Sequence, residues 1–132
     1  MSLAHTIPYD IASQTPVEDT IVGRWLVDGF RNITTELFPA GTVSMSLKFA
    51  KSNQVAEPDF NAASSGTNQW SFCDVIDLND GSSIDGTTGV ALSATTTRTF
   101  EWNNNESKWV AIICSAYATG TIAGNVLLST NQ

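Results

Sequence analysis

The segment TVSMSLKFA, residues 42–50, alternates apolar and polar side chains with a period of two. Val43, Met45, Leu47 and Phe49 occupy every second position, and small polar residues or Lys48 lie between them. Successive side chains of a β-strand point to opposite faces, so the pattern is typical of a strand with one face in the core. It therefore predicts a half-buried strand.

Segments of similar character lie on both sides of this strand. Upstream, IVGRWLVD places Ile21, Trp25 and Val27 on one face, and FRNITTELF places Ile33 and Leu37 inward. Further strands are expected downstream at QWSFCDVID, GVALS, TRTFEW, KWVAIICSAYA and GTIAGNVLLS. Turn residues separate the segments at 39–41, 80–81, 85–86, 103–105 and 119–120. We predict an all-β, single-domain antiparallel β-sandwich, jelly-roll or galactose-binding-like, of about seven or eight strands.

Two regions depart from the strand pattern. Residues 1–20 contain Pro8 and Pro16 but few large apolar side chains, and they are expected to form an extended N-terminal arm. Residues 21–132 are then the sandwich domain, a size that buries one core. Residues 52–68 form a long polar connection of the kind that carries function or contacts a partner.

The charge balance and the apolar runs exclude several classes of protein. The net charge is −7, and the six basic residues are scattered, which argues against a nucleic-acid binder. No basic segment followed by an apolar one opens the chain, so no signal peptide is expected. The longest apolar stretch, WVAIICSAYA, is far short of the roughly 20 residues of a membrane helix. We expect no membrane partner.

The residue types needed for common catalytic sites are scarce. The single histidine, His5, lies in the expected arm, where it is poorly placed to serve a Ser-His-Asp set or a zinc site. Cys73 and Cys114 each sit in an apolar run, and the sequence favours buried thiols over a disulfide between them. Paired carboxylates could support hydrolysis, but the sequence selects no pair. We therefore expect a protein that is not an enzyme.

The stretch DVIDLNDGSSIDG, residues 74–86, is the nearest approach to a metal site. An EF-hand loop needs Gly at position 6 and Glu at position 12. Counted from Asp77, this stretch has Gly81 at position 5 and Thr88 at position 12, so it does not fit. A looser calcium site is one interpretation, with ligands from Asp77, Asn79, Asp80 and Asp85. The favoured alternative is a pair of Asp-Gly turns between strands, with no cofactor.

Two tryptophans flank the segment NNNESK. Trp102 and Trp109 would form a sugar-binding platform if they lay together at one end of a hairpin. The favoured alternative is that both anchor strand ends in the core, because alternation places Trp102 on the same face as Phe100.

Several marks in residues 46–129 carry a family resemblance. They are Ser52-Asn53 after an extended strand, Trp70, Phe100, Lys108-Trp109-Val110, and the turn Thr119-Gly120-Thr121. In these marks the chain resembles small β-sandwich proteins encoded among the structural genes of tailed bacteriophages, and it shares them with discoidin-like and carbohydrate-binding sandwiches. The resemblance implies capsid decoration, a role in a tail or baseplate, or host contact.

These observations lead to one expected function and one alternative. We expect a non-enzymatic virion structural protein, made in the host cytoplasm, that contacts copies of itself and other virion proteins. The arm at residues 1–20 would dock on a neighbour, and its deletion would leave a folded sandwich that fails to assemble. The alternative is a carbohydrate-binding module, assisted by calcium or not, that uses Trp102, Trp109 or the loop from Asp77 to Asp85.

Overall fold

The computed structural model describes residues 6–103 and 107–130. Within them the chain forms one antiparallel sheet and no helix, so no helix there is long and apolar enough to span a membrane. The all-β, antiparallel, single-domain prediction is confirmed. The nine strands are β1 (Thr6–Gln14), β2 (Thr20–Leu26), β3 (Asn32–Ser52), β4 (Ser71–Phe72), β5 (Val75–Asp77), β6 (Ser83–Ile84), β7 (Val90–Leu92), β8 (Arg98–Trp102) and β9 (Trp109–Ser129).

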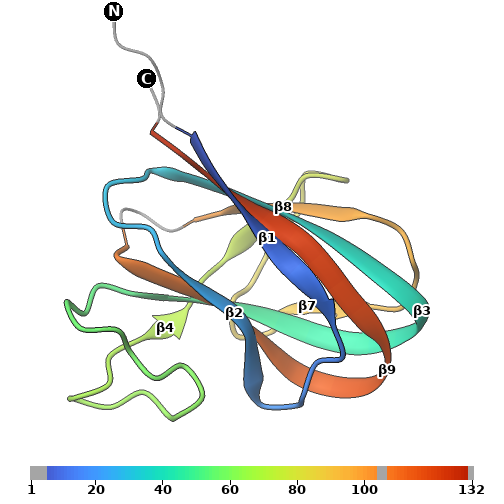
Figure 1. The fold of residues 1–132 in the computed structure, drawn as a ribbon, viewed down its shortest axis with the longest axis horizontal. Helices are drawn as coiled ribbons and strands as arrows, with labels where there is room; N and C mark the ends of the chain where they lie inside the picture. The colour runs from blue at the N-terminus through green and yellow to red at the C-terminus, as the bar shows by residue number, and fades with distance from the viewer. Residues whose placement is uncertain (1–5, 104–106, 131–132) are drawn as a thin grey trace, which may run out of the picture.

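The two longest strands, β3 and β9, pair with each other along their length and bend together (Figure 1). The pairing register shifts between Ala40 and Ser44. Gly41 and Gly120 face each other at the bend and have φ values of 83° and 104°, which L-residues with a side chain rarely adopt. The prediction that residues 39–41 and 119–120 end strands is therefore wrong, because both strands continue through the bend.

The bend folds the single sheet into two layers. One layer contains β1, the second half of β9, the first half of β3, and then β8, β5 and β6. The other contains β2, the first half of β9 and the second half of β3, with β4 and β7 beyond. The main core lies between the two layers, so the molecule is a sandwich. Its two layers belong to one continuous sheet, because β3 and β9 run through both.

The alternating pattern of residues 42–50 places side chains as predicted. Val43, Met45, Leu47 and Phe49 are all buried in the main core. In β2 the pattern is interrupted, because the register with β9 shifts between Ile21 and Gly23. The shift moves Ile21 to the outer face and leaves Val22 and Val27 in the core, so the predicted shared face of Ile21 and Val27 is wrong.

The segment predicted as one strand, QWSFCDVID, is divided between the layers. β4 pairs with the end of β3, and β5 pairs with β8. The chain crosses between them at Cys73 and Asp74, where the Cys73 N–H donates to the Phe49 carbonyl at 2.7 Å. The Asp74 carboxylate accepts the Gly86 N–H at 2.7 Å, which holds the crossing in place.

The expected N-terminal arm differs from the structure over residues 6–14. These residues form β1, which pairs antiparallel with β9, and Ile11 is buried in the main core. The apolar side chains at 7, 9 and 11 alternate with Pro8 and Asp10, a short strand pattern that the two prolines of the segment obscure. Deletion of residues 1–20 would remove a strand and is expected to destabilise the fold. Residues 1–5, including His5, lie outside the described residues.

Candidate functional site

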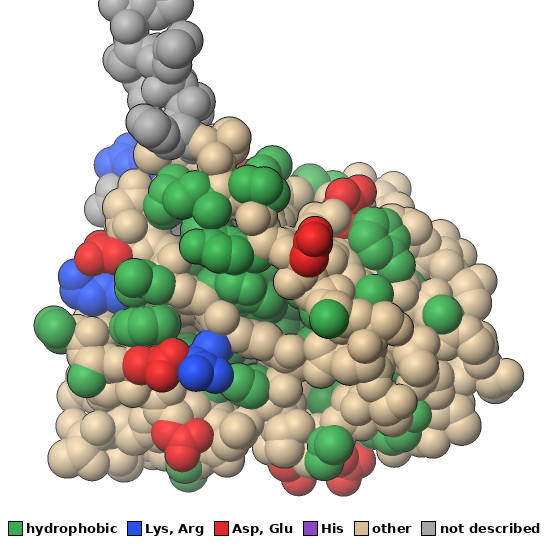
Figure 2. Space-filling view, in the orientation of Figure 1, with side chains coloured by type: hydrophobic (Ala, Val, Ile, Leu, Met, Phe, Trp, Pro, Cys, Tyr) green, Lys and Arg blue, Asp and Glu red, His purple; other side chains and the backbone are tan. Residues whose placement is uncertain are grey.

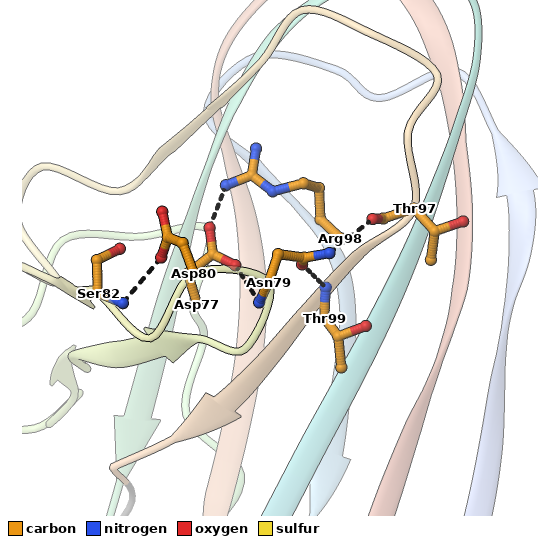
Figure 3. Close-up of polar contacts among 7 residues, drawn as sticks. All are labelled: Asp77, Asn79, Asp80, Ser82, Thr97, Arg98 and Thr99. Atoms are coloured by element: carbon orange, nitrogen blue, oxygen red, sulfur yellow. Dashed lines mark hydrogen bonds and ion pairs between the residues drawn. The ribbon is translucent and has the colours of Figure 1, made fainter.

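The Asp77 carboxylate lies buried at the end of β5 (Figure 3). Its Oδ2 accepts a hydrogen bond from Arg98 Nη2 at 2.6 Å, and its Oδ1 accepts the Asn79 N–H at 2.9 Å. The Asp77 carbonyl accepts the Gly81 N–H at 2.7 Å, which closes the turn. Because Arg98 already neutralises this carboxylate, Asp77 is part of a structural ion pair.

The neighbouring polar side chains also hold the turn. Asn79 Oδ1 accepts the Thr99 N–H at 3.0 Å and so attaches the turn to β8. Asp80 Oδ1 accepts the Ser82 N–H at 2.8 Å (Figure 3). The hydroxyl and N–H of Ser82 lower the pKa of the Asp80 carboxyl. These contacts are those of side-chain-capped turns, as the favoured interpretation of the sequence expects.

Asp85 stands apart from this group, after β6. Its Oδ1 accepts the Thr87 N–H at 2.8 Å and the Thr87 hydroxyl at 2.7 Å. The Thr87 hydroxyl and N–H lower the pKa of the Asp85 carboxyl. Among residues 6–103 and 107–130, no three His, Cys, Asp or Glu side chains gather closely enough to hold a metal ion. The calcium interpretation thus has no preassembled acidic ligand set in the described chain.

The two flanking tryptophans lie on opposite faces of the sheet. Trp102 is buried in the main core, where its Nε1 donates to the Thr35 hydroxyl at 2.7 Å and its ring meets Phe49 edge-on at 4.9 Å. Trp109 is half-buried on the outer face of the second layer, in a separate apolar cluster. The structure therefore does not bring Trp102 and Trp109 together as a platform.

The polar connection predicted at residues 52–68, which was expected to carry function or contact a partner, folds over the outer face of the second layer. Phe60 from this connection is buried in the separate cluster, and Trp70 packs beside it at a ring-centroid distance of 5.9 Å. Asn68 binds the Asp59 backbone through two hydrogen bonds of 2.8 Å: its Oδ1 accepts the Asp59 N–H, and its Nδ2 donates to the Asp59 carbonyl. The polar side chains of the connection thus form hydrogen bonds within the loop, and its aromatic side chains pack on the small apolar cluster of the sheet.

A pocket of about 350 Å³ opens between this loop, β4 and the end of β3. Its walls include Trp70, Lys51, Asn53, Gln69 and several serines. A second hollow of about 210 Å³ lies along Trp70 and is also lined by Lys48 and Phe72. Trp70 therefore forms a wall of both hollows.

Both cysteines are buried free thiols, as the sequence favoured. Burial raises the pKa of the Cys73 thiol to about 11 and also raises that of Cys114. Thiolates are the reactive form, so neither cysteine has the properties of a nucleophile.

The sandwich is open on the side where β1 and β2 form its edges. In the described chain each of these strands pairs with β9 alone. Ile7 and Tyr9 pair with buried residues of β9 and face the space between the layers, as does Trp25 of β2. Phe30 packs against the same core from the turn after β2. Figure 2 shows hydrophobic side chains gathered on this face. We call Ile7, Tyr9, Trp25 and Phe30 the open edge.

Comparisons with known proteins show the fold and no family. No protein-family model matches the sequence, and no curated protein matches it significantly. Among solved structures, the crystal structure of the SPBc2 prophage-derived protein YomS is similar, with a TM-score of 0.71 and 11% identity. The match covers 98% of this chain and 97% of that chain. The chain therefore shares a complete fold with a prophage-derived protein.

Sequence reasoning selected the connection but missed the side chains that form its pocket. Trp70 was read as one residue of a strand, whereas it is the wall of two hollows. Two large aromatic residues, Phe60 and Trp70, bracket an otherwise small and polar segment, and this contrast is the available signal. The sequence carries no comparable signal for the open edge, because this surface exists only where the folded sheet leaves β1 and β2 without a second neighbouring strand.

Proposed function

We propose that this protein is a non-enzymatic structural component of a bacteriophage particle that assembles through contacts between copies at the open edge. The observation that carries the proposal is the exposure of core-facing apolar side chains at one side of the sandwich. Tyr9 is 39% exposed although it faces the space between the layers. The full-length similarity to a prophage-derived protein supports the phage origin.

A second copy is the partner that the chemistry of the open edge suits best. A two-fold contact brings identical patches together, so a charged patch would repel itself and an uncharged apolar patch would not. The four residues of the open edge carry no charge, whereas the chain has a net charge of −7. Two copies therefore meet with the least electrostatic cost at such a surface.

The contact is expected to use side chains and not an added strand. Pro8 gives β1 a position with no N–H to donate. In β2 the Ile21 N–H already donates to Asn61 Oδ1 at 2.8 Å, and Arg24 is paired with Glu57. Both edges are thus protected against strand addition, which leaves the apolar opening between them as the surface to cover.

The experiment is a measurement of mass in solution across a range of protein concentrations, by light scattering or sedimentation. We expect the wild-type protein to dimerise, and Tyr9→Glu to raise the dissociation constant by at least about tenfold. Leu78→Glu is the matched control, because Leu78 is an exposed apolar residue that lies away from the open edge, after β5. The melting temperature of each variant shows that it is folded.

Two results would refute the proposal. The first is a wild-type protein that remains monomeric up to about 100 µM, well above the range of specific dimers. The second is a dimer that Tyr9→Glu leaves intact and Leu78→Glu disrupts, because contact would then occur on another face.

The alternative function, carbohydrate binding, loses the joint platform of Trp102 and Trp109 that was first considered for it. Trp102 is buried and bonded to Thr35, so it has no ring face for a sugar. Carbohydrate binding by this fold would need another aromatic residue with polar neighbours.

A further inference from the structure

We propose that the pocket beside Trp70 binds a carbohydrate that carries an acidic group, either a carboxylate or a phosphate. This inference goes beyond the structural role proposed above and does not rest on it. It concerns a different side of the molecule, because β9 and β3 lie between β2, at the open edge, and β4, at the pocket.

Trp70 is held in place before any ligand arrives. Its Nε1 donates to the Ala62 carbonyl at 3.0 Å, and its ring meets Phe72 edge-on at 5.1 Å. Phe60 packs against the same ring. An aromatic wall that is already ordered loses little entropy when a sugar ring stacks on it.

Polar side chains with unused hydrogen-bonding capacity surround this wall. The Asn53 side-chain amide and the Ser71 hydroxyl line the pocket and make no hydrogen bond to another described residue. Gln69 donates through Nε2 to the Gly66 carbonyl at 3.2 Å, which leaves its Oε1 available as an acceptor. Donors and acceptors set around an aromatic ring match the hydroxyl groups of a sugar, and 350 Å³ suits a small ligand.

The charge of the pocket selects among sugars. Among the described residues that line it, Lys51 is the one charged residue, in a chain with thirteen acidic residues and six basic ones. Its Nζ makes one long hydrogen bond of 3.4 Å, to the Asn103 carbonyl, and forms no ion pair with a described carboxylate. An ammonium group with donors to spare favours an anionic substituent on the ligand.

The binding test uses matched charged and neutral probes. Trigalacturonic acid and its fully methyl-esterified form share one sugar backbone and differ in whether the carboxyl groups are charged or capped by a methyl ester, and glucose 1-phosphate and glucose form a second pair. We expect each acidic probe to bind about tenfold more tightly than its neutral partner. The chemical-shift change of the Trp70 indole N–H, assigned with Trp70→Phe, places the binding at the pocket. Comparison of the two pairs shows whether a carboxylate or a phosphate is preferred.

Two variants test the roles of the pocket residues without disturbing the fold. Lys51→Met is expected to abolish the difference between acidic and neutral probes. Asn53→Ala is expected to weaken the binding of both without loss of stability, because the Asn53 side chain makes no hydrogen bond to another described residue. Lys108→Met is the control, because Lys108 pairs with Asp28 at 3.3 Å and does not line the pocket. Equal binding of an acid and its neutral partner would overturn the charge assignment. No binding at about 10 mM, or binding that Lys51→Met and Asn53→Ala leave unchanged, would overturn the site.

Discussion

Replacement of Gly120 by alanine tests whether the bend in β9 depends on glycine. The φ of Gly120 is 104°, and an added Cβ would lie 3.1 Å from both the Thr42 carbonyl oxygen and the Val43 Cα. Both neighbours belong to the backbone of β3, so neither can move without disturbing the pairing. A non-glycine residue in such a conformation costs about 1–3 kcal/mol. We expect Gly120→Ala to lower the free energy of unfolding by about 2 kcal/mol, or the melting temperature by roughly 7 °C for this chain length.

The control is the same substitution at a position without these constraints. An added Cβ at Gly66 would meet no atom within 4 Å, and its φ is not in the left-handed range. Gly66→Ala should leave stability unchanged or raise it by about 0.5 kcal/mol, because alanine restricts the unfolded chain. Urea unfolding of both variants at equal m-value measures the difference. If Gly120→Ala and Gly66→Ala unfold at the same urea concentration, the bend does not depend on glycine and the reasoning fails.

Three further predictions concern the core, the acidic turn and the thiols. Thr35→Val leaves the Trp102 indole N–H buried without its partner and should cost about 1–3 kcal/mol in urea unfolding, and an unchanged midpoint would show that the bond contributes nothing. The melting temperature should be the same in chelator and in excess calcium, because Arg98 and the Asn79 N–H occupy the Asp77 oxygens, and a rise with calcium would favour the calcium site. Because the pKa of Cys73 is about 11, alkylation of the native protein at pH 8, followed by mass spectrometry, should be slow and should accelerate about tenfold per pH unit below that pKa. Fast alkylation at pH 8 would mean that the thiol is accessible.

Local patterns predicted the core of this protein well. The alternation that placed Phe49 and Leu47 in the core depends on backbone geometry that each strand carries by itself. The same rule placed Trp102 on the buried face of Phe100, and both are buried. Asp-Gly pairs likewise form turns through bonds to their own backbone, which nearby residues determine.

The features that the sequence did not reveal depend on distant contacts. A glycine at positive φ serves equally in a turn that ends a strand and in a bend within one. Gly41 and Gly120 form a bend because β3 and β9 pair on both sides of them. In the same way, β1 is a strand because β9 is its neighbour, more than a hundred residues away, and Trp70 lines a pocket because the loop returns to cover the sheet. Such contacts have no counterpart in the spacing of nearby residues.

The two proposed sites make a joint prediction, because they lie on different sides of one subunit. A dimer formed at the open edge would carry two Trp70 pockets, and two linked sites bind a surface of repeated sugars far more tightly than one site does. Tyr9→Glu should therefore leave the affinity for soluble trigalacturonic acid unchanged but weaken retention on immobilised polygalacturonate by about 100-fold. Lys51→Met should weaken both measurements while leaving the dimer intact in solution. If Tyr9→Glu lowered the affinity for the soluble sugar as well, the pocket and the open edge would not be independent, and the assignment of separate roles to them would fail.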